Sequence, residues 1–538
     1  MTQTTKWPET VMFWGAGATC ELGFPTTARQ GKLFIKLSEI SQEEDYPEKL
    51  EEFDFFTGTY LEEMADLLYI LDDDINADSF SERMVTNISD SQRDKARELF
   101  KLSSEDDVTN LVVNLRYTYD FSALKQLLRL CTKNKRTIVM TVFNLIDYHV
   151  GNNEGLVIKE ERGDLLLESR RLLGARNALI MLVVSSMTGA YLNALESKRD
   201  VIRKYKSFAA GLASYMQEEG EDRRDLPQNE RDFYLFSYAV ISLNWDHFLN
   251  WMIFNAHKDF NDDPRNDCFA GRHIRLKFFN DFAIMMGLRE LRRGPGDELT
   301  EKIWYPYNET VVQRINDPDY DHGKIVRMGK YYYPHGCLAW RCCPNCGSMN
   351  GSFGDDWDEG SESLFPPSLV PAFRKIVDRT ELEERSVKEG RHDVISCLYC
   401  DAETELKDTM LVMQSAVKSN APPALRIIQS DINASLQHAK HIIFMGYSLP
   451  PDDMVWRSIL LARKGDVKVS VVVGIGGPGH WQYCSKPENI EGGVDERFET
   501  FFDIFQAEGK DPQENMRFYT KGIPEVFEDI EIDELLKW

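Results

Sequence analysis

The chain has 538 residues, 42% of them hydrophobic, which is enough for roughly two to four structural units with buried cores. Its formal net charge of -25 disfavours nucleic acid as a direct partner, because phosphates are repelled unless a local basic face compensates. The longest apolar run, residues 178–184, is far shorter than the ~20 residues of a membrane-spanning helix, so we expect a buried helix there and no membrane association. The polar first residues lack a secretory signal, which predicts a cytoplasmic protein.

The first predicted element is a strand at residues 11–14, which leads into the turn Gly15-Ala16-Gly17 and then into a helix. Backbone amides in such a turn can approach a pyrophosphate at the positive end of the helix. Cys20 stands where the dehydrogenase fingerprint has its third glycine, and no strand ending in an acidic residue follows within ~20 residues. Hydride transfer is therefore disfavoured, and an ordinary tight turn is the alternative.

The predicted domain organisation has a core interrupted twice. Residues 1–42 form the first part of a Rossmann-like core, and residues 43–230 form a large helical insertion with few strand signals. The core is expected to continue over residues 231–336, to be followed by a cysteine-rich module over residues 337–402, and to end with residues 403–538. Strands that alternate with helices around these insertions predict an α/β fold with a mostly parallel sheet.

Two polar residues follow the next predicted core strand, at residues 238–243. Asn244 and Asp246 would lie at the carboxyl end of a parallel strand, which is where doubly wound sheets bind ligands. An amide there can hold ribose hydroxyls or a water, and a carboxylate can accept a hydrogen bond from a carboxamide. Either side chain could instead cap the helix that follows.

A histidine ends a run of aromatic residues just before the cysteine-rich module. His335 is a candidate general base, because imidazole is the side chain best suited to accept a proton near neutral pH. The alternative is a histidine that packs at the end of a strand.

The cysteine-rich module carries two Cys-x-x-Cys pairs, Cys343 with Cys346 and Cys397 with Cys400. Two such pairs can close a tetrahedral zinc site that leaves no position for a catalytic water, so the predicted site is structural. The pairs are far apart in the sequence, and Cys337, Cys342 or His392 could replace one ligand.

The last motif follows a helix predicted at residues 432–441 and a strand predicted at residues 442–445. Gly446 permits close approach of a ligand to the backbone, and Ser448 can donate a hydrogen bond to a phosphate or ribose oxygen. Alone, this motif is only a turn from strand to helix. A further strand is expected at residues 467–474.

Taken in order, these motifs resemble the sirtuin family, including the sirtuin-like proteins of bacterial anti-phage defence. Thr19 stands where the family usually has a serine, and the helical insertion lies outside the resemblance. The residues that carry the resemblance are Gly15, Ala16, Gly17, Gly23, Pro25, Asn244, Asp246, His335, Gly336, Cys343, Cys346, Cys397, Cys400, Gly446 and Ser448.

The resemblance implies that NAD binds across the core and that its nicotinamide glycosidic bond is cleaved. On this mapping Asn244 holds the ribose hydroxyls and a water, His335 is the general base, and Asp246 contacts the nicotinamide carboxamide. The remaining implied NAD-binding residues are Gly15, Ala16, Gly17, Thr19 and Pro25, with the glycine turn facing the pyrophosphate, and Gly446 and Ser448 on the adenosine side.

Departures from the family pattern separate its two activities. Deacylating sirtuins carry Pro-Asp-Phe-Arg after the glycine turn, whereas Thr26 and Thr27 follow Pro25 here. They also have Thr-Gln before the asparagine, where this chain has Ser242 and Leu243, and their Phe-Gly-Glu after the zinc module is missing. These changes resemble the defence-type enzymes that transfer the ribosyl group to water.

The sequence therefore predicts an NAD glycohydrolase that depletes NAD as an anti-phage effector and is activated by a phage component or a second defence protein. The helical insertion is the expected surface for homo-oligomers. An NAD-dependent protein-lysine deacylase is one alternative. A non-catalytic sensor of NAD or ADP-ribose is the other.

Overall fold

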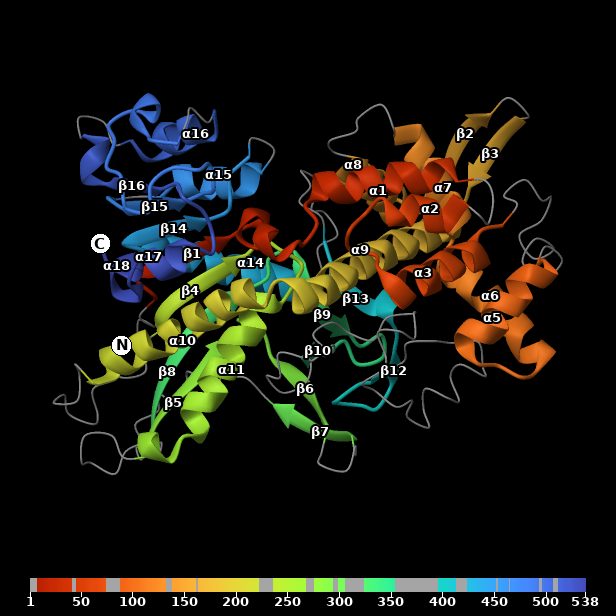
Figure 1. Cartoon of the computed structure of the whole chain (residues 1–538), viewed down its shortest axis with the longest axis horizontal. Coiled ribbons are helices and arrows are strands. Elements are labelled where there is room, and N and C mark those ends of the chain that lie inside the picture. Colours follow the sequence, from red (N-terminus) through yellow and green to blue (C-terminus); the bar gives the residue numbers. More distant parts are fainter. Residues whose placement is uncertain are drawn as a thin grey trace.

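The structure is a computed structural model, and it shows a sheet-containing core and a layer of helices that are linked by long helices (Figure 1). It describes residues 7–40, 45–73, 88–131, 138–160, 163–221, 236–267, 275–293, 299–304, 324–353, 395–412, 423–450, 453–463, 465–492, 496–506 and 511–538.

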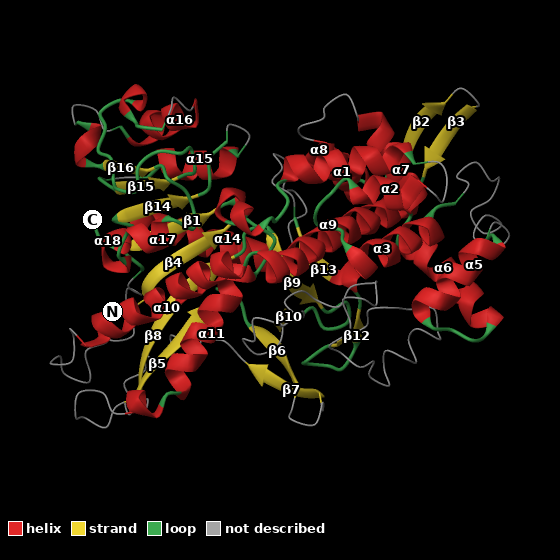
Figure 2. Ribbon diagram, viewed as in Figure 1, coloured by secondary structure: helices red, strands yellow, loops and turns green. Residues whose placement is uncertain are grey.

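The core is built on a seven-stranded sheet (Figure 2). Its strands are β1 (Thr10–Trp14), β4 (Phe236–Ser242), β5 (Arg275–Asp281), β8 (Lys324–Tyr332), β14 (His441–Met445), β15 (Lys468–Val472) and β16 (Met516–Tyr519). They lie in the order β16-β15-β14-β1-β4-β8-β5, and all neighbours are parallel. The predicted α/β fold with a mostly parallel sheet is confirmed.

Helices cover both faces of this sheet. Adjacent side chains of a strand point to opposite faces, so neighbouring residues of β1 contact different helices. Phe13 packs against Trp456, whereas Trp14 stacks on Phe208 and Phe527. The continuous apolar run of β1 is thus buried on both faces, as expected for a central parallel strand. The core helices are α10 (Arg199–Glu221), α11 (Phe248–Asp262), α14 (Pro423–His438), α15 (Met454–Leu461), α16 (Glu496–Phe505), α17 (Val526–Asp529) and α18 (Ile532–Leu536).

The helical layer lies between β1 and α10 in the chain and begins with α1 (Thr27–Glu39), which packs against the helices that follow it. It contains α2 (Asp45–Glu51), α3 (Gly58–Leu71), α5 (Asp90–Phe100), α6 (Glu105–Thr118), α7 (Phe121–Cys131), α8 (Ile138–Gly151) and α9 (Ser169–Ser197), with a hairpin of β2 (Leu156–Glu160) and β3 (Gly163–Leu167). The predicted insertion at residues 43–230 also includes α10, which packs beside α11 on the core sheet. The helical stretch of sequence is thus shared between the layer and the core.

The long helix α9 runs through the centre of the helical layer (Figure 1). By length and composition alone it could cross a membrane, but 83% of its most apolar 18-residue stretch is buried in the protein. Residues 178–184 lie within this buried part, which confirms the predicted core helix.

A second sheet of five strands is built from segments that lie on both sides of the core strand β8 in the chain. Its order is β13-β9-β10-β6-β7, and β6 and β10 are its parallel pair. The bounds are β6 (Met286–Arg293), β7 (Leu299–Trp304), β9 (Gly336–Cys342), β10 (Met349–Phe353) and β13 (Thr409–Leu411), and a separate hairpin pairs β11 (Ile395–Ser396) with β12 (Glu403–Thr404). Strand β9 leads directly to the first cysteine pair.

Candidate active site and metal centre

The two glycine turns that the sequence predicts are packed against each other. Gly15 N donates to Met445 O at 3.0 Å, and Gly17 N donates to Gly446 O at 2.9 Å. Gly446 has a φ of 60°, and a Cβ at this position would lie 2.1 Å from Ala18 N. These glycines are therefore needed for the contact between the turns, which fixes the carboxyl ends of β1 and β14 side by side.

A cavity of about 420 Å³ lies where these turns meet. The sheet order reverses at β1, because the chain continues to β4 on one side of it and to β14 on the other. Ligands of open α/β sheets bind outside the carboxyl ends of the strands at such a switch point. The volume is within the ~300–1,000 Å³ of small-molecule sites.

Nine of the sequence-predicted site residues line this cavity. They are Gly15, Ala16, Gly17, Thr19, Pro25, Asn244, Asp246, Gly446 and Ser448. They come from three segments of the chain that are far apart in the sequence, and the parallel sheet brings them together.

The side chain of Asn244 joins the end of β4 to the glycine turn after β1. Its Nδ2 donates to Gly15 O at 3.1 Å and to Thr19 Oγ1 at 3.3 Å. Both hydrogen bonds use the amide nitrogen, so the amide oxygen is the atom with which Asn244 can accept a hydrogen bond from a ligand.

Asp246 is 3% exposed and lies at the start of α11. Its Oδ1 accepts a hydrogen bond from Phe248 N at 3.2 Å, so the capping role that the sequence left open is present. Burial raises the pKa of Asp246 to about 6, although hydrogen bonds from Phe248 and Asn244 favour the ionised form. A buried carboxyl with this pKa can exchange a proton near neutral pH.

His335 occupies a different position from the other predicted residues. It is 1% exposed, its ring lies edge-on to Trp456 with the centroids 6.4 Å apart, and its main-chain oxygen accepts from Val412 N at 2.9 Å. His335 is not among the described residues that line the cavity. The structure thus brings Asn244 and Asp246 together at the cavity and packs His335 at the end of β8.

The helical layer supplies part of the cavity wall, which the sequence did not predict. Met140 of α8 and Met187 of α9 line it, as does Gln30 of α1, whose Nε2 donates to Ser186 Oγ at 3.1 Å. Apolar residues at helical spacing give no signal that separates these two methionines from core residues. Their role depends on how the layer packs on the core.

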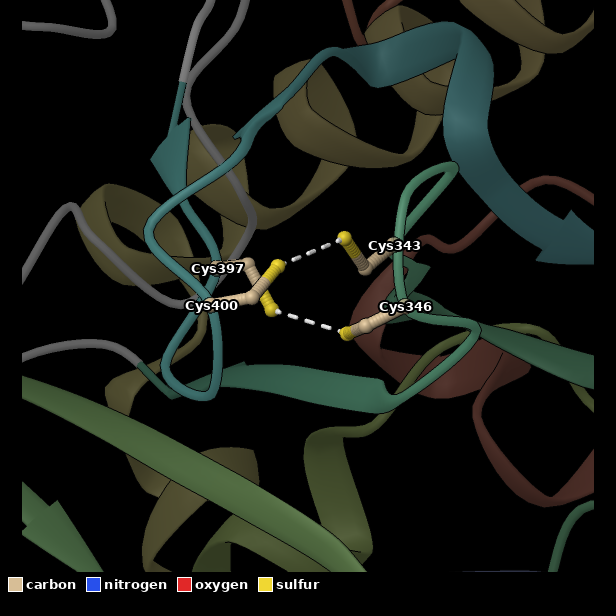
Figure 3. Close-up of side chains that lie close together, drawn as sticks. All are labelled: Cys343, Cys346, Cys397 and Cys400. Carbon is tan, nitrogen blue, oxygen red and sulfur yellow. Dashed lines mark hydrogen bonds between the residues drawn. The ribbon is translucent and has the colours of Figure 1, made fainter.

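The four predicted cysteines of the two pairs form one cluster (Figure 3). Their sulfur atoms all lie within 4.8 Å of one another, and Cys343 Sγ and Cys400 Sγ are 3.7 Å apart, as are Cys346 Sγ and Cys397 Sγ. Four thiolates at the Zn–S distance of ~2.3 Å have sulfur atoms ~3.8 Å apart, so the spacing fits a metal ion such as zinc.

Local hydrogen bonds shape both cysteine turns in the same way. Gly347 N donates to Cys343 O at 2.9 Å, and Asp401 N donates to Cys397 O at 3.0 Å, with a positive φ at both donors. Hydrogen bonds from Ser348 lower the pKa of Cys346 to about 6, which favours a thiolate. Burial raises the pKa of Cys343 in the same turn, so what the two turns have in common is the placement of their sulfur atoms.

The other candidate ligands are separate from this cluster. Cys337 is buried in the core, and Cys342 Sγ lies 3.7 Å from Gly347 O, outside the four-sulfur group. His392 lies outside the described residues.

No protein-family model matches the chain, and comparison with curated proteins gives no significant match. The resemblance to sirtuins therefore depends on the motifs and their order alone.

Proposed function

We propose that this protein hydrolyses NAD to nicotinamide and ADP-ribose. The observation that carries the proposal is the cavity at the carboxyl ends of β1, β4 and β14, because it gathers nine residues of the sirtuin-like motifs in one place. This is also where doubly wound sheets bind nucleotides.

The amino end of α1 supports a phosphate-containing ligand. Thr26 and Thr27 line the cavity, and Thr26 Oγ1 caps the helix by accepting from Arg29 N at 3.3 Å. Backbone N–H groups and the helix dipole favour negative charge at this end. A pyrophosphate beside the glycine turn would be stabilised in this way, with the Asn244 amide oxygen available to a ribose hydroxyl.

We also propose that the four-cysteine centre binds zinc in a structural role. Four cysteine ligands complete a tetrahedron, so no coordination position remains for substrate or water. The ion would fix the module that follows β9.

The proposed biological role is NAD depletion in anti-phage defence, which the motif resemblance supports. Activity would await a phage component or a second defence protein, since constitutive NAD loss is harmful to the host. The helical layer would mediate homo-oligomers. Val157 and Leu166, paired on its hairpin, are 54% and 52% exposed, which supports a contact surface there.

The first test is product analysis after purified protein is incubated with NAD, with and without an acetyl-lysine peptide. We expect nicotinamide and free ADP-ribose without peptide, with loss of both products in Asn244→Ala. Asn193→Ala is the matched control and should retain the activity, because Asn193 of α9 is half-buried, donates to Asp54 O and is not among the described residues that line the cavity. Release of nicotinamide that requires peptide and yields acetylated ADP-ribose would identify a deacylase instead.

A second candidate function is an NAD or ADP-ribose sensor without catalysis. It is favoured by one observation, namely that His335, the base expected from the sirtuin resemblance, is packed against Trp456 and does not line the cavity. Binding of NAD with no turnover, with or without phage lysate or protein oligomerisation, would support the sensor.

A further inference from the structure

The cavity contains its own candidate proton acceptor, an inference that rests on the proposed NAD hydrolysis. Among the described residues that line the cavity, Asp246 alone carries a carboxyl group. The other titratable side chains of the lining are engaged: Tyr447 Oη donates to Asp453, and Cys20 Sγ donates to Ala16 O at 3.2 Å. Burial also raises the pKa of Cys20, which disfavours its thiolate.

Three hydrogen bonds fix the position of Asp246 and of the residues around it. Leu243 N donates to Trp14 O at 2.9 Å, and Trp245 O accepts from Leu338 N at 2.8 Å. The Asp246 side chain is tethered through Oδ1 to Phe248 N. These bonds fix the carboxyl group beside Asn244 at the cavity wall, and a preorganised group loses little freedom when it reacts.

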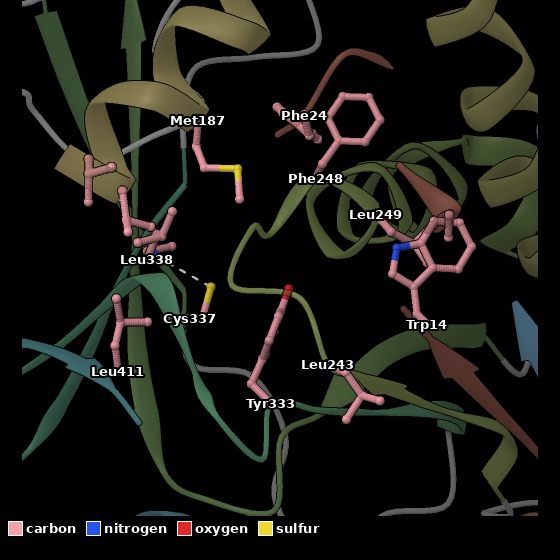
Figure 4. Packing of buried hydrophobic residues seen from close by; sticks show 14 of the residues in the cluster. Trp14, Phe24, Met187, Leu243, Phe248, Leu249, Tyr333, Cys337, Leu338 and Leu411 are labelled. Atoms are coloured by element: carbon pink, nitrogen blue, oxygen red, sulfur yellow. Dashed lines mark hydrogen bonds between the residues drawn. The ribbon is translucent and has the colours of Figure 1, made fainter. Parts of the chain in front are cut away.

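Behind the cavity, Asp246 faces neutral groups. The charge of Asp246 acts on the side chains of Tyr205 of α10, Tyr331 and Tyr333 at the end of β8, and Cys337 of β9. Figure 4 shows Tyr333 and Cys337 beside the segment between Leu243 and Phe248. Burial raises the pKa of all four groups, so none is charged near neutral pH. Burial is the main cause of the raised pKa of Asp246.

We propose that Asp246, rather than His335, is the general base of NAD hydrolysis. The bond between C1′ of the ribose and the nicotinamide nitrogen breaks, and its electron pair stays on the nicotinamide. A water oxygen then bonds to C1′, and the proton that this water loses passes to the Asp246 carboxylate and onward to solvent. The negative carboxylate also opposes the positive charge that develops on the ribose.

This role differs from the contact to the nicotinamide carboxamide that the sirtuin resemblance implies for Asp246. A carboxamide contact contributes to binding, so its loss raises KM. A general base acts only when ionised, so its loss lowers kcat and removes a pH dependence. Because ionisation of Asp246 occurs with a pKa of about 6, kcat should fall as pH decreases through this value.

The test compares kcat and KM across pH 5–8 for wild type, Asp246→Asn and His335→Gln. Asp246→Asn keeps an oxygen that can accept from Phe248 N, so the start of α11 is preserved. We expect its kcat to fall about 10²–10⁴-fold. The decrease of kcat at low pH, here called the acidic limb, should be lost, while calorimetry shows NAD binding within a few-fold of wild type. His335→Gln should retain the limb. Formate added to Asp246→Asn should restore part of the rate.

The opposite pattern would overturn the assignment. If Asp246→Asn keeps the limb and changes only KM, or if the limb is lost in His335→Gln alone, Asp246 is not the base and the hydrolase proposal survives. If wild type binds NAD and never cleaves it, hydrolysis itself is wrong and this inference falls with it. Asp246→Glu provides a second variant with a carboxyl group, which should keep a measurable rate and a limb if Asp246→Asn misfolds.

Discussion

The four-cysteine centre and the cavity both gather residues from distant parts of the sequence, but their geometry has different origins. Each cysteine pair is shaped within its own turn, by hydrogen bonds such as that from Gly347 N to Cys343 O. The geometry of the cavity instead depends on contacts between segments that are far apart in the sequence. Asn244 meets Gly15 only because β4 pairs with β1 in the sheet, and Met187 reaches the cavity wall only because the helical layer packs there.

This difference determines what a substitution should disturb. Local turns tolerate changes elsewhere but depend on each ligand, because an incomplete tetrahedron holds the metal poorly. The cavity depends on backbone contacts between turns and on the contact between layer and core. Substitutions at these three places should therefore give separable effects.

The largest effect is expected at the metal centre. Cys397→Ser should abolish stoichiometric zinc binding, measured by elemental analysis of the purified protein, and should lower the melting temperature because metal-binding energy contributes to folding. Cys342→Ser is the matched control, since its sulfur lies outside the cluster, and it should retain one zinc per chain. Equal zinc loss in both variants would refute the assigned ligand set.

An intermediate effect is expected where the two glycine turns meet. Gly446→Ala places a Cβ 2.1 Å from Ala18 N at a residue whose φ is 60°. We expect the free energy of unfolding to decrease by more than the ~1–3 kcal/mol that backbone strain alone would cost. NAD binding should also weaken. Gly465→Ala has a φ of 87° with nothing within 4 Å of the added Cβ. In this control, denaturant unfolding should show a stability loss that comes from strain alone, and NAD titration should show no loss of affinity. Similar losses in both variants would show that contact between the turns contributes nothing.

The sequence was sufficient where the determinant is local or strictly periodic. The strands predicted at residues 11–14, 238–243, 442–445 and 467–474 are confirmed as β1, β4, β14 and β15. Runs that are apolar or mostly apolar mark strands that are buried on both faces. The four cysteines were found from their spacing and form one cluster.

Element boundaries and packing partners were less accessible. The helix predicted at residues 432–441 is α14, which begins at Pro423 and ends at His438. It stops because Lys440 N and His441 N both donate to Glu9 O, a contact with the start of β1 that no local pattern reveals. The same reason explains why Met140 and Met187 were not predicted at the cavity, and why the position of His335 away from its lining was not anticipated.

The smallest effect is expected at the contact between the helical layer and the cavity loop. Phe143 of α8 meets Trp245 edge-on, with ring centroids 6.1 Å apart, and Trp245 stands between Asn244 and Asp246. Phe143→Leu keeps an apolar side chain but removes an aromatic pair worth ~0.5–1.5 kcal/mol. Because this contact supports the loop that carries both polar residues, NAD affinity should fall several-fold.

Phe260→Leu is the control for this substitution. It removes a stacked pair with Phe278, 3.8 Å between centroids, near the end of α11 that is opposite to Asp246, and neither ring is among the described residues that line the cavity. Stability should decrease in both variants, measured by denaturant unfolding, but NAD affinity should decrease only in Phe143→Leu. If both variants bind NAD as wild type does, the helical layer lines the cavity without affecting NAD affinity. If affinity follows the Phe143 contact, movement of the layer can control the site, which is the coupling that an effector activated through its helical insertion requires.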